Sequence, residues 1–190
     1  MTRPQQEGYA MKLMIASDLH GSAYYCEKLA EAYRREGAGR LLLLGDVLYH
    51  GPRNDLPRDY DPRRTAAILN GLEGEVFGVR GNCEAEVDAV MLRFPVMGDY
   101  ALIPSGDRLV FATHGHVYSP DRLPPLKDGD ALLFGHTHVP ENSVRGGVRV
   151  VNPGSVSIPK EGSPRGYMTL EDGLFIWKTL DGEEYDRARL

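Results

Sequence analysis

Five short apolar segments of this chain each end in a turn that carries aspartate, asparagine or histidine, and every one of these turns contains glycine. The five site turns, as we call them, are Asp18–Gly21, Gly45–Asp46, Gly81–Glu84, His114–His116 and Gly135–His138. In open α/β sheets the ligand crevice forms outside the carboxyl ends of the strands, so turns that are far apart in sequence converge there. The sequence therefore predicts an α/β fold whose strand ends bring the site turns together.

The first half of the chain alternates between apolar runs and helical patterns. Continuous apolar runs, typical of strands buried on both faces, lie at 13–16, 41–44 and 76–79. Helical patterns run from the N-cap residue Ser22 to Gly37 or Gly39, over 62–70 and over 84–93. This alternation is typical of β-α-β units, which contain parallel strands.

Short β-like runs separated by turn residues dominate the second half of the chain. They lie at 101–104, 109–112, 131–134, 148–151, 166–170 and 174–178. We therefore expect a core of two sheets with helices on the outside.

Composition limits the classes of partner and location. The 190 residues are 42% hydrophobic, which fits one domain over residues 11–190, while the polar residues 1–10 read as a flexible extension. A net charge of -5 provides no basic surface, so we expect neither a duplex nucleic acid nor a membrane as partner, and leave a short oligonucleotide open. With only Cys26 and Cys83, and no apolar run of about 18 residues, a soluble cytoplasmic protein is expected.

Two of the site turns have the compactness of metal sites. Asp18 and His20 can direct a carboxylate oxygen and an imidazole nitrogen at one ion, while His136 and His138 can reach two neighbouring ions. The two oxygens of Asp46 suit it to bridge two cations roughly 3.5–4 Å apart, a clamp for displacement at phosphorus. Nitrogen and oxygen ligands without thiolate suit Mn²⁺, Fe²⁺, Ni²⁺ or Zn²⁺, and we expect two ions, with Mn²⁺ first among these metals.

In their order, the site turns resemble the signature of the calcineurin-like metallophosphoesterases, which runs D-x-H, G-D, G-N-[HC]-[DE], G-H and G-H-x-H. The segments 45–48, 50–54, 80–83 and 152–160 are moreover similar to the small bacterial YfcE-type phosphodiesterases of that family. The resemblance covers residues 11 to 180. It implies a four-layer αββα sandwich, in which two mixed β-sheets are flanked by helices.

The resemblance also implies a dinuclear metal centre and a reaction. One ion would be held by Asp18, His20, Asp46 and His138, and the other by Asp46, Asn82, His114 and His136. A hydroxide that bridges the two ions would attack phosphorus. The expected function is hydrolysis of a small phosphodiester.

Cys83 departs from the larger members of the family, which carry histidine at this position. A thiol with a reference pKa near 8.5 is a poor acid, and it carries no positive charge to meet a dianionic monoester. Glu84, which would orient that histidine, is left without its partner. We therefore expect a preference for diesters, with Cys83, Asn82 and His114 as the catalytic residues; the less favoured alternative is that Cys83 is a small buried hydrophobe.

Three further residues are candidates for contact with the substrate. His50 and Arg53 follow the bridging Asp46 closely enough to reach it, and His116 lies beside His114. Against this interpretation, basic residues in loops are usually solvated, and His116 could pack behind the ligands. Self-association into a homo-oligomer also stays open.

Two other functions are weighed against the phosphodiesterase. A non-catalytic protein-binding scaffold with the same fold, as in the retromer subunit, would have lost metal ligands, and this chain keeps all seven. A phosphomonoesterase is disfavoured by Cys83.

Overall fold

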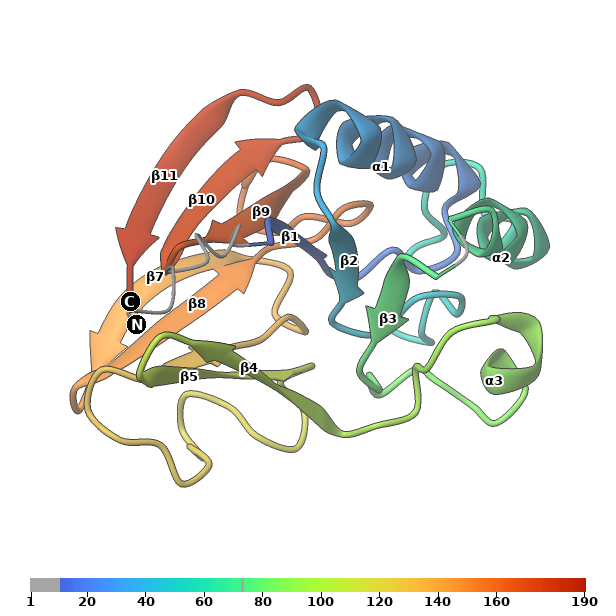
Figure 1. The fold of residues 1–190 in the computed structure, drawn as a ribbon. Coiled ribbons are helices and arrows are strands. Elements are labelled where there is room, and N and C mark those ends of the chain that lie inside the picture. Colours follow the sequence, from blue (N-terminus) through green and yellow to red (C-terminus); the bar gives the residue numbers. More distant parts are fainter. Residues whose placement is uncertain (1–10, 73) are drawn as a thin grey trace, which may run out of the picture.

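Two mixed sheets form the centre of the fold, in a computed structural model that describes residues 11–72 and 74–190 (Figure 1). The first sheet has the order β11-β10-β9-β1-β2-β3. Its strands are Glu184–Arg189, Leu174–Thr179, Gly166–Glu171, Leu13–Ala16, Arg40–Leu43 and Val76–Gly78. The second sheet has the order β4-β5-β6-β8-β7. Its strands are Tyr100–Ser105, Arg108–Thr113, Ala131–Leu133, Val148–Pro153 and Pro140–Arg145.

Each sheet combines parallel and antiparallel pairs. Strand β1 runs parallel to β2 and antiparallel to β9, and β6 runs parallel to both of its neighbours, β5 and β8. The outer pairs β4–β5 and β7–β8 are antiparallel. Two mixed sheets with helices confirm the predicted fold class. The extension predicted over residues 1–10 lies outside the described residues.

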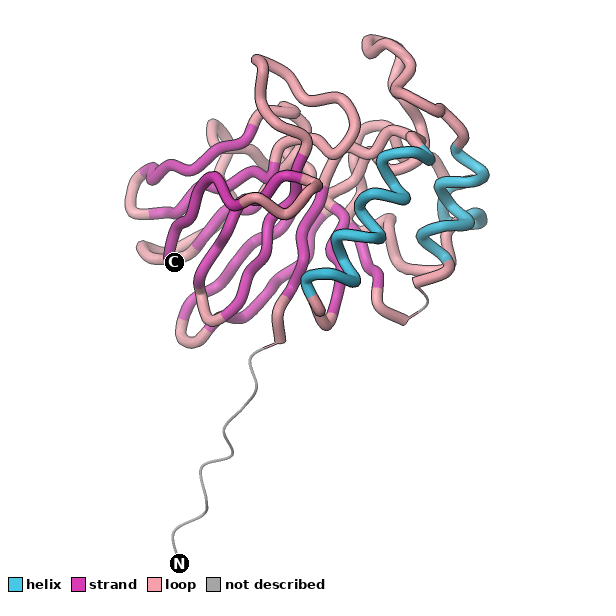
Figure 2. The backbone as a smooth tube through the Cα atoms, turned by 90° about the horizontal axis from the view of Figure 1, so that it is seen from above, coloured by secondary structure: helices cyan, strands magenta, loops and turns pink. Residues whose placement is uncertain are grey.

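Two helices cover the outer face of the first sheet, α1 (Ala23–Glu36) and α2 (Pro62–Asn70) (Figures 1 and 2). The Ser22 side chain accepts a hydrogen bond from the backbone of Tyr25 and so begins α1, and Gly37 ends it in the left-handed conformation. Asp61 caps α2 in the same manner, and proline occupies its first turn. Both predicted helices are confirmed.

Alternate residues of β1 face two different cores. Met14 and Ala16 belong to the cluster between the first sheet and the helices, whereas Leu13 and Ile15 belong to the cluster between the two sheets. This division follows from the strand geometry, since successive side chains point to opposite faces. A strand that is buried on both faces must be apolar throughout, which explains the continuous run that predicted it.

The outer face of the second sheet is covered by irregular chain. Tyr118 and Leu126, from the segment between β5 and β6, pack against a buried cluster that includes Phe111 and Phe134. Within the residues that the structure describes, this fourth layer contains no helix. The helices of the sandwich thus lie against the first sheet.

The third predicted helix is wrong in its extent, because only α3 (Asp88–Met91) of the range 84–93 is helical. The carboxylate of Glu84 accepts a hydrogen bond from the backbone of Asp46 (2.9 Å), which holds the chain at Glu84 in a loop. The side chain of Asp88 reaches back to the backbone N–H of Ala85 (3.0 Å), as a residue in the first turn of a helix does. A long-range contact therefore delays the start of the helix.

Strands β7 and β11 are absent from the sequence predictions. They are the edge strands of their sheets, and most of their side chains are exposed or half-buried. Because edge strands with one solvated face need no apolar run, hydrophobic pattern does not reveal them. None of the helices in the described part of the chain is both long and apolar enough to span a membrane.

Candidate metal centre

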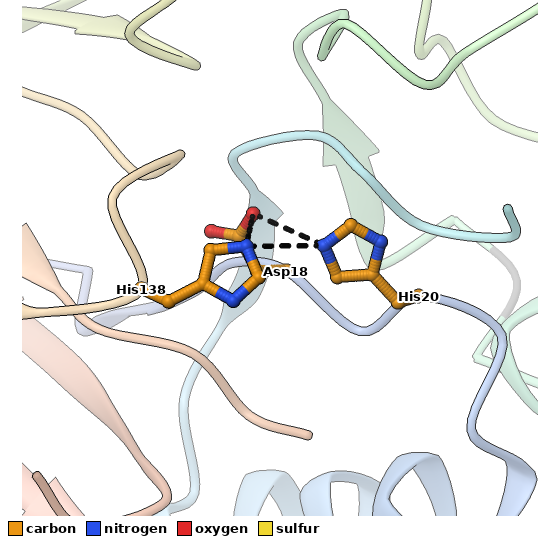
Figure 3. Close-up of side chains that lie close together, drawn as sticks. All are labelled: Asp18, His20 and His138. Atoms are coloured by element: carbon orange, nitrogen blue, oxygen red, sulfur yellow. Dashed lines mark hydrogen bonds and ion pairs between the residues drawn. The ribbon is translucent and has the colours of Figure 1, made fainter. Parts of the chain in front are cut away.

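The first cluster of site residues consists of Asp18, His20 and His138, all buried (Figure 3). His138 Nε2 lies 3.2 Å from Asp18 Oδ1 and 3.2 Å from His20 Nε2. The separation between His20 Nε2 and Asp18 Oδ1 is 3.5 Å. Three potential ligand atoms, from turns 118 positions apart in the sequence, therefore point at one another.

The outward hydrogen bonds of the histidines determine which nitrogen faces the cluster. His20 Nδ1 lies 2.8 Å from the carbonyl oxygen of Tyr49, and His138 Nδ1 lies 2.7 Å from that of Ile158. A carbonyl oxygen only accepts, so Nδ1 carries the proton in both rings and the neutral Nε2 offers a lone pair. Histidine ligands of metals are oriented in this way.

The hydrogen bonding of Asp18 shows that these residues fit a cation. Its Oδ2 accepts hydrogen bonds from Ser17 Oγ (2.6 Å) and from the backbone of His136 (3.0 Å). Its Oδ1 is buried and has no hydrogen-bond partner among the described residues. Leaving such an atom unpaired is costly, and the nearest groups are imidazole nitrogens with lone pairs of their own. A bound cation would satisfy all three ligand atoms at once.

Asp46 lies between this cluster and a second one. Its Oδ2 is 3.7 Å from His20 Nε2, whereas its Oδ1 is 3.4 Å from His114 Nε2. The backbone N–H of Cys83 donates to Oδ1 (2.9 Å) and fixes the orientation of the carboxylate. One carboxylate thus presents one oxygen to each cluster.

The second cluster contains His114, Asn82 and His136. His114 Nε2 lies 3.2 Å from Asn82 Oδ1 and 3.2 Å from His136 Nδ1. The other nitrogen of His114 lies 2.7 Å from the carbonyl oxygen of Leu44, which places the proton on Nδ1 as in the first cluster. The structure thus brings together all seven side chains that the sequence predicts as metal ligands.

The pKa values show that the two carboxylates favour positive charge among the imidazoles. Burial opposes the protonated form of His114, but Asp46 and Asp18 outweigh it and raise the pKa of His114 to about 9. Burial likewise opposes ionisation of Asp18, yet the neighbouring imidazoles of His138 and His20 outweigh it and hold the pKa of Asp18 well below its usual range. A divalent cation would supply this positive charge without protonating the histidines.

The backbone of the site is strained. Asp18, His20, Asp46, His136 and His138 all adopt positive φ angles, between 48° and 67°. Such conformations are uncommon for residues other than glycine and cluster at functional sites, where the surrounding structure holds them.

Glycine permits the close approach of the second and third site turns. A Cβ atom on Gly81 would overlap both the carboxylate and the backbone nitrogen of Asp46. Only glycine, which has no side chain, leaves room for Asp46 at position 81.

Glu84 has no histidine to orient at position 83, and the structure provides it with backbone partners instead. Its carboxylate accepts hydrogen bonds from the backbone N–H groups of Asp46 (2.9 Å), Val47 (2.7 Å) and Gly81. It therefore ties the second site turn to the third, a role that needs no histidine at position 83. Burial raises the pKa of Glu84 above its ordinary value, although the backbone bonds oppose this shift.

Cys83 is a half-buried free thiol at the edge of both clusters. Its sulfur and the ligand atoms of His20 and Asp46 all lie within 4.8 Å of one another. Burial raises the pKa of the Cys83 thiol strongly, and the nearby carboxylate of Asp46 adds to the increase. The thiol is therefore neutral at physiological pH.

A cavity of about 450 Å³ opens beside the clusters. Its walls are formed by Asp46, Arg53, Asn54, Asn82, His136, Thr137, His138 and Lys160. Of the three predicted substrate contacts, only Arg53 lines this cavity. His50 packs edge-on against Tyr49 and Tyr60, with ring centroids 4.7 and 5.2 Å away. His116 is exposed and does not line the cavity, and its ring lies 5.4 Å from that of His114.

Sequence reasoning missed Asn54, Thr137 and Lys160 as cavity residues. Asn54 and Lys160 each end a segment that carries the family resemblance, 50–54 and 152–160, and this was the signal available for them. Thr137 stands between two predicted ligands, His136 and His138.

Two mixed sheets whose strand ends gather histidine, aspartate and asparagine side chains define a metallophosphoesterase. Residues 11–172 match the calcineurin-like phosphoesterase superfamily domain, and the chain belongs to this superfamily. Membership implies phosphoester hydrolysis with the help of divalent metal ions.

Individual relatives agree with this assignment. The chain is 46% identical to phosphodiesterase YfcE of Escherichia coli K12 over 164 residues, which cover 86% of this chain and 89% of the relative. The solved structure of the E. coli phosphoesterase YfcE superposes with a TM-score of 0.90 and 42% identity, covering 94% of this chain and 99% of that one. Vacuolar protein sorting 29 of Cryptosporidium parvum shares the fold alone, with a TM-score of 0.61 at 16% identity over 96% of this chain and 98% of that one.

Proposed function

We propose that this chain is a metal-dependent phosphodiesterase with a dinuclear centre. The observation that carries the proposal is the convergence of three Nε2 atoms, from His20, His114 and His138, on the carboxylates of Asp18 and Asp46. The 46% identity to a phosphodiesterase supports the same reaction. The substrate would be a small phosphodiester bound in the adjoining cavity.

The ligand sets follow from the two clusters. Asp18, His20 and His138 would hold one ion, and Asn82, His114 and His136 would hold the other. Asp46 would contribute one carboxylate oxygen to each, because its two oxygens face different clusters. Nitrogen and oxygen donors of this kind suit Mn²⁺ best among the candidates, with Fe²⁺, Ni²⁺ and Zn²⁺ as alternatives. Divalent cations bound there would neutralise charge on the phosphate and lower the pKa of water.

The remaining residues would bind and orient the diester. Arg53 lines the cavity and can donate two hydrogen bonds to a non-bridging phosphate oxygen. Burial, followed by the charges of His114 and Arg80, lowers the pKa of His116, so this imidazole is neutral near pH 7. His116 would therefore contact a part of the substrate that extends beyond the cavity, as a neutral hydrogen-bonding group beside His114.

Cys83 supports a diester rather than a monoester as substrate. Its raised pKa leaves a neutral thiol beside the clusters, with no positive charge to meet a second phosphate charge and no readily transferred proton. A diester carries one negative charge at the scissile phosphate. Diesters with good leaving groups therefore suit this site best.

Metal removal tests the proposal. The protein would be dialysed against a chelator, its metal content measured, and hydrolysis of bis(4-nitrophenyl) phosphate and 4-nitrophenyl phosphate followed with and without Mn²⁺. We expect no activity in the metal-free protein, recovery with two Mn²⁺ ions per chain, and a higher kcat/KM for the diester. Full activity after verified metal loss would refute metal dependence, and metal-bound protein without any hydrolysis would favour a scaffold.

A further inference from the structure

Lys160 is an exposed cation that lines the cavity, and the proposed reaction does not use it. It lines the cavity on the side of His138, whereas Arg53 comes from the separate loop after β2. Within the described ranges, no carboxylate lies at ion-pair distance from either side chain. The only carboxylate among the residues that line the cavity is Asp46, which already faces both clusters.

The backbone around Lys160 is fixed relative to two site residues. Its own N–H donates to the carbonyl oxygen of His138 (3.2 Å), and its carbonyl oxygen accepts from Ser163 Oγ (2.6 Å). Earlier in the same loop, Ser155 Oγ donates to the backbone oxygen of Asp18 (2.8 Å). A lysine on an anchored loop loses less freedom on binding than one on a mobile loop. The loop therefore sets the position of Lys160 beside the clusters.

The charge balance of the site leaves Lys160 without a counter-charge. A diester brings one negative charge at phosphorus, and in the proposed function this charge is met by divalent cations and by Arg53. The protein as a whole carries a net charge of -5, so positive charge in the cavity is a local feature. A second anionic group on the substrate would pair with Lys160.

We propose that Lys160 selects phosphodiesters that carry a second phosphate group on one ester arm, as the 3′-phosphorylated end of a nucleotide chain does. The proposal rests on the proposed function, and it names the substrate class of that site. Phosphate is the group to expect because an ammonium acts as a compact charge that binds phosphate oxygens without bidentate geometry.

Two matched substrates test this selectivity. Thymidine 5′-(4-nitrophenyl phosphate) and its 3′-phosphorylated form release the same 4-nitrophenolate, so their difference isolates the second phosphate. We expect kcat/KM with Mn²⁺ to be roughly tenfold higher for the 3′-phosphorylated form, through a lower KM, since one charge-assisted contact has about this value. Lys160→Ala should remove the advantage, and Lys160→Arg should keep most of it.

Lys127→Ala is the matched control, because Lys127 is exposed and does not line the cavity. A second readout is calorimetric binding of thymidine 3′,5′-bisphosphate and thymidine 5′-monophosphate to the metal-free protein. Wild-type protein should prefer the bisphosphate, and Lys160→Ala should lose this preference.

The outcomes separate the two proposals. Hydrolysis of both diesters with equal kcat/KM, or a ratio that Lys160→Ala leaves unchanged, would overturn the inference and leave the phosphodiesterase standing. If neither diester is hydrolysed with Mn²⁺, the proposed function fails, and the binding preference in wild type and Lys160→Ala alone decides the inference.

Discussion

Two carboxylates of this chain, the half-buried Glu36 and the buried Asp18, have opposite surroundings. Glu36, at the end of α1, accepts hydrogen bonds from Lys178 Nζ (2.8 and 2.9 Å) and from the hydroxyl of Tyr167 (2.8 Å). Asp18, at the end of β1, has no lysine or arginine partner in the described chain, and its Oδ1 faces two imidazoles. The protein itself neutralises Glu36, whereas it provides Asp18 with no lysine or arginine partner among the described residues.

The backbone conformation also differs between the two regions: it is regular at Glu36 and strained at Asp18. Glu36 lies in a regular helix with a serine cap and a glycine end, where local sequence and fold agree. Asp18 and His20 adopt positive φ angles in a turn that the second site turn fixes, as His20 N–H donates to the oxygen of Asp46 (2.9 Å). The end of α1 follows the conformational preferences of its residues. The turn at Asp18 and His20 is held in an unfavourable backbone conformation, in which its side chains converge with those of the other site turns.

The largest effect on the site is expected from a change at Asp46, the carboxylate shared by both clusters. Asp46→Asn replaces a charged oxygen by an amide nitrogen, so both proposed ions should bind more weakly. We expect kcat/KM for an aryl diester to fall at least about 100-fold, because even losses in the outer shell of a metal site cost 10–100-fold. The control is Glu36→Gln, which should lower stability and leave the metal content unchanged. Normal turnover with two ions in Asp46→Asn would contradict the assignment.

A second test asks whether metal stabilises the fold through the site. Ions that bind only the folded protein add about 2.7 kcal/mol at a hundredfold excess over Kd, which corresponds to roughly 5–10 °C in Tm for a chain of this size. We expect Mn²⁺ to raise the Tm of wild-type protein and of Glu36→Gln by similar amounts. The rise should be much smaller in Asp18→Asn. If saturating Mn²⁺ shifts none of the three proteins, the side chains do not form a metal site.

The position of the site could be predicted from sequence because it follows from strand geometry. Asp18, Asp46 and Asn82 come within four residues of the ends of strands that are largely apolar, and parallel strands end at the same edge of a sheet. Once those strands are recognised, the convergence of the turns requires no knowledge of loop structure. The capped helices α1 and α2 could be predicted for a similar reason, since their signals are local.

Features that depend on long-range contacts could not be predicted. Helix α3 starts late because Glu84 bonds to a turn 37 to 38 positions earlier, and hydrophobic pattern carries no record of such a bond. Lys160 reaches the cavity because its loop is attached to the backbone of Asp18 and His138. Edge strands such as β7 need no apolar face and leave no periodic signal.

The half-buried carboxylate of Glu84 is bonded to backbone N–H groups rather than to a cationic side chain, and this arrangement limits the effect expected of Cys83→His. A histidine at this position has a reference pKa near 6.5, so it adds a group that can be cationic beside the phosphate. Because Glu84 is already bonded to the backbone, the new imidazole would be poorly oriented, and the gain should stay well below the 10²–10⁴-fold of optimal acid catalysis.

We expect the ratio of monoesterase to diesterase kcat/KM to rise roughly tenfold in Cys83→His at equal metal occupancy. Cys26→Ser is not a suitable control because it alters the core, so Cys83→Ser is the matched variant, and its ratio should stay at the wild-type value. An unchanged ratio in Cys83→His would mean that Cys83 does not set the preference for diesters.

The smallest expected effect is the pH dependence contributed by Glu36. Burial raises the pKa of this carboxyl, but hydrogen bonds from Lys178 and Tyr167 outweigh it, so the pKa lies below its ordinary value. A group with a lowered pKa in the folded state stabilises the protein above its unfolded pKa, about 4.3, and this stability is lost as the pH falls through the folded value. Urea unfolding of the metal-free protein should therefore show wild type about 1 kcal/mol more stable than Glu36→Gln at pH 7, with the difference shrinking below about pH 4. Glu31→Gln, which alters an exposed pair with Lys28, is the control and should barely change stability at either pH. A difference between wild type and Glu36→Gln that stays constant down to pH 3 would show that packing rather than charge accounts for the contribution of Glu36, and the contrast with Asp18 would then rest on the site alone.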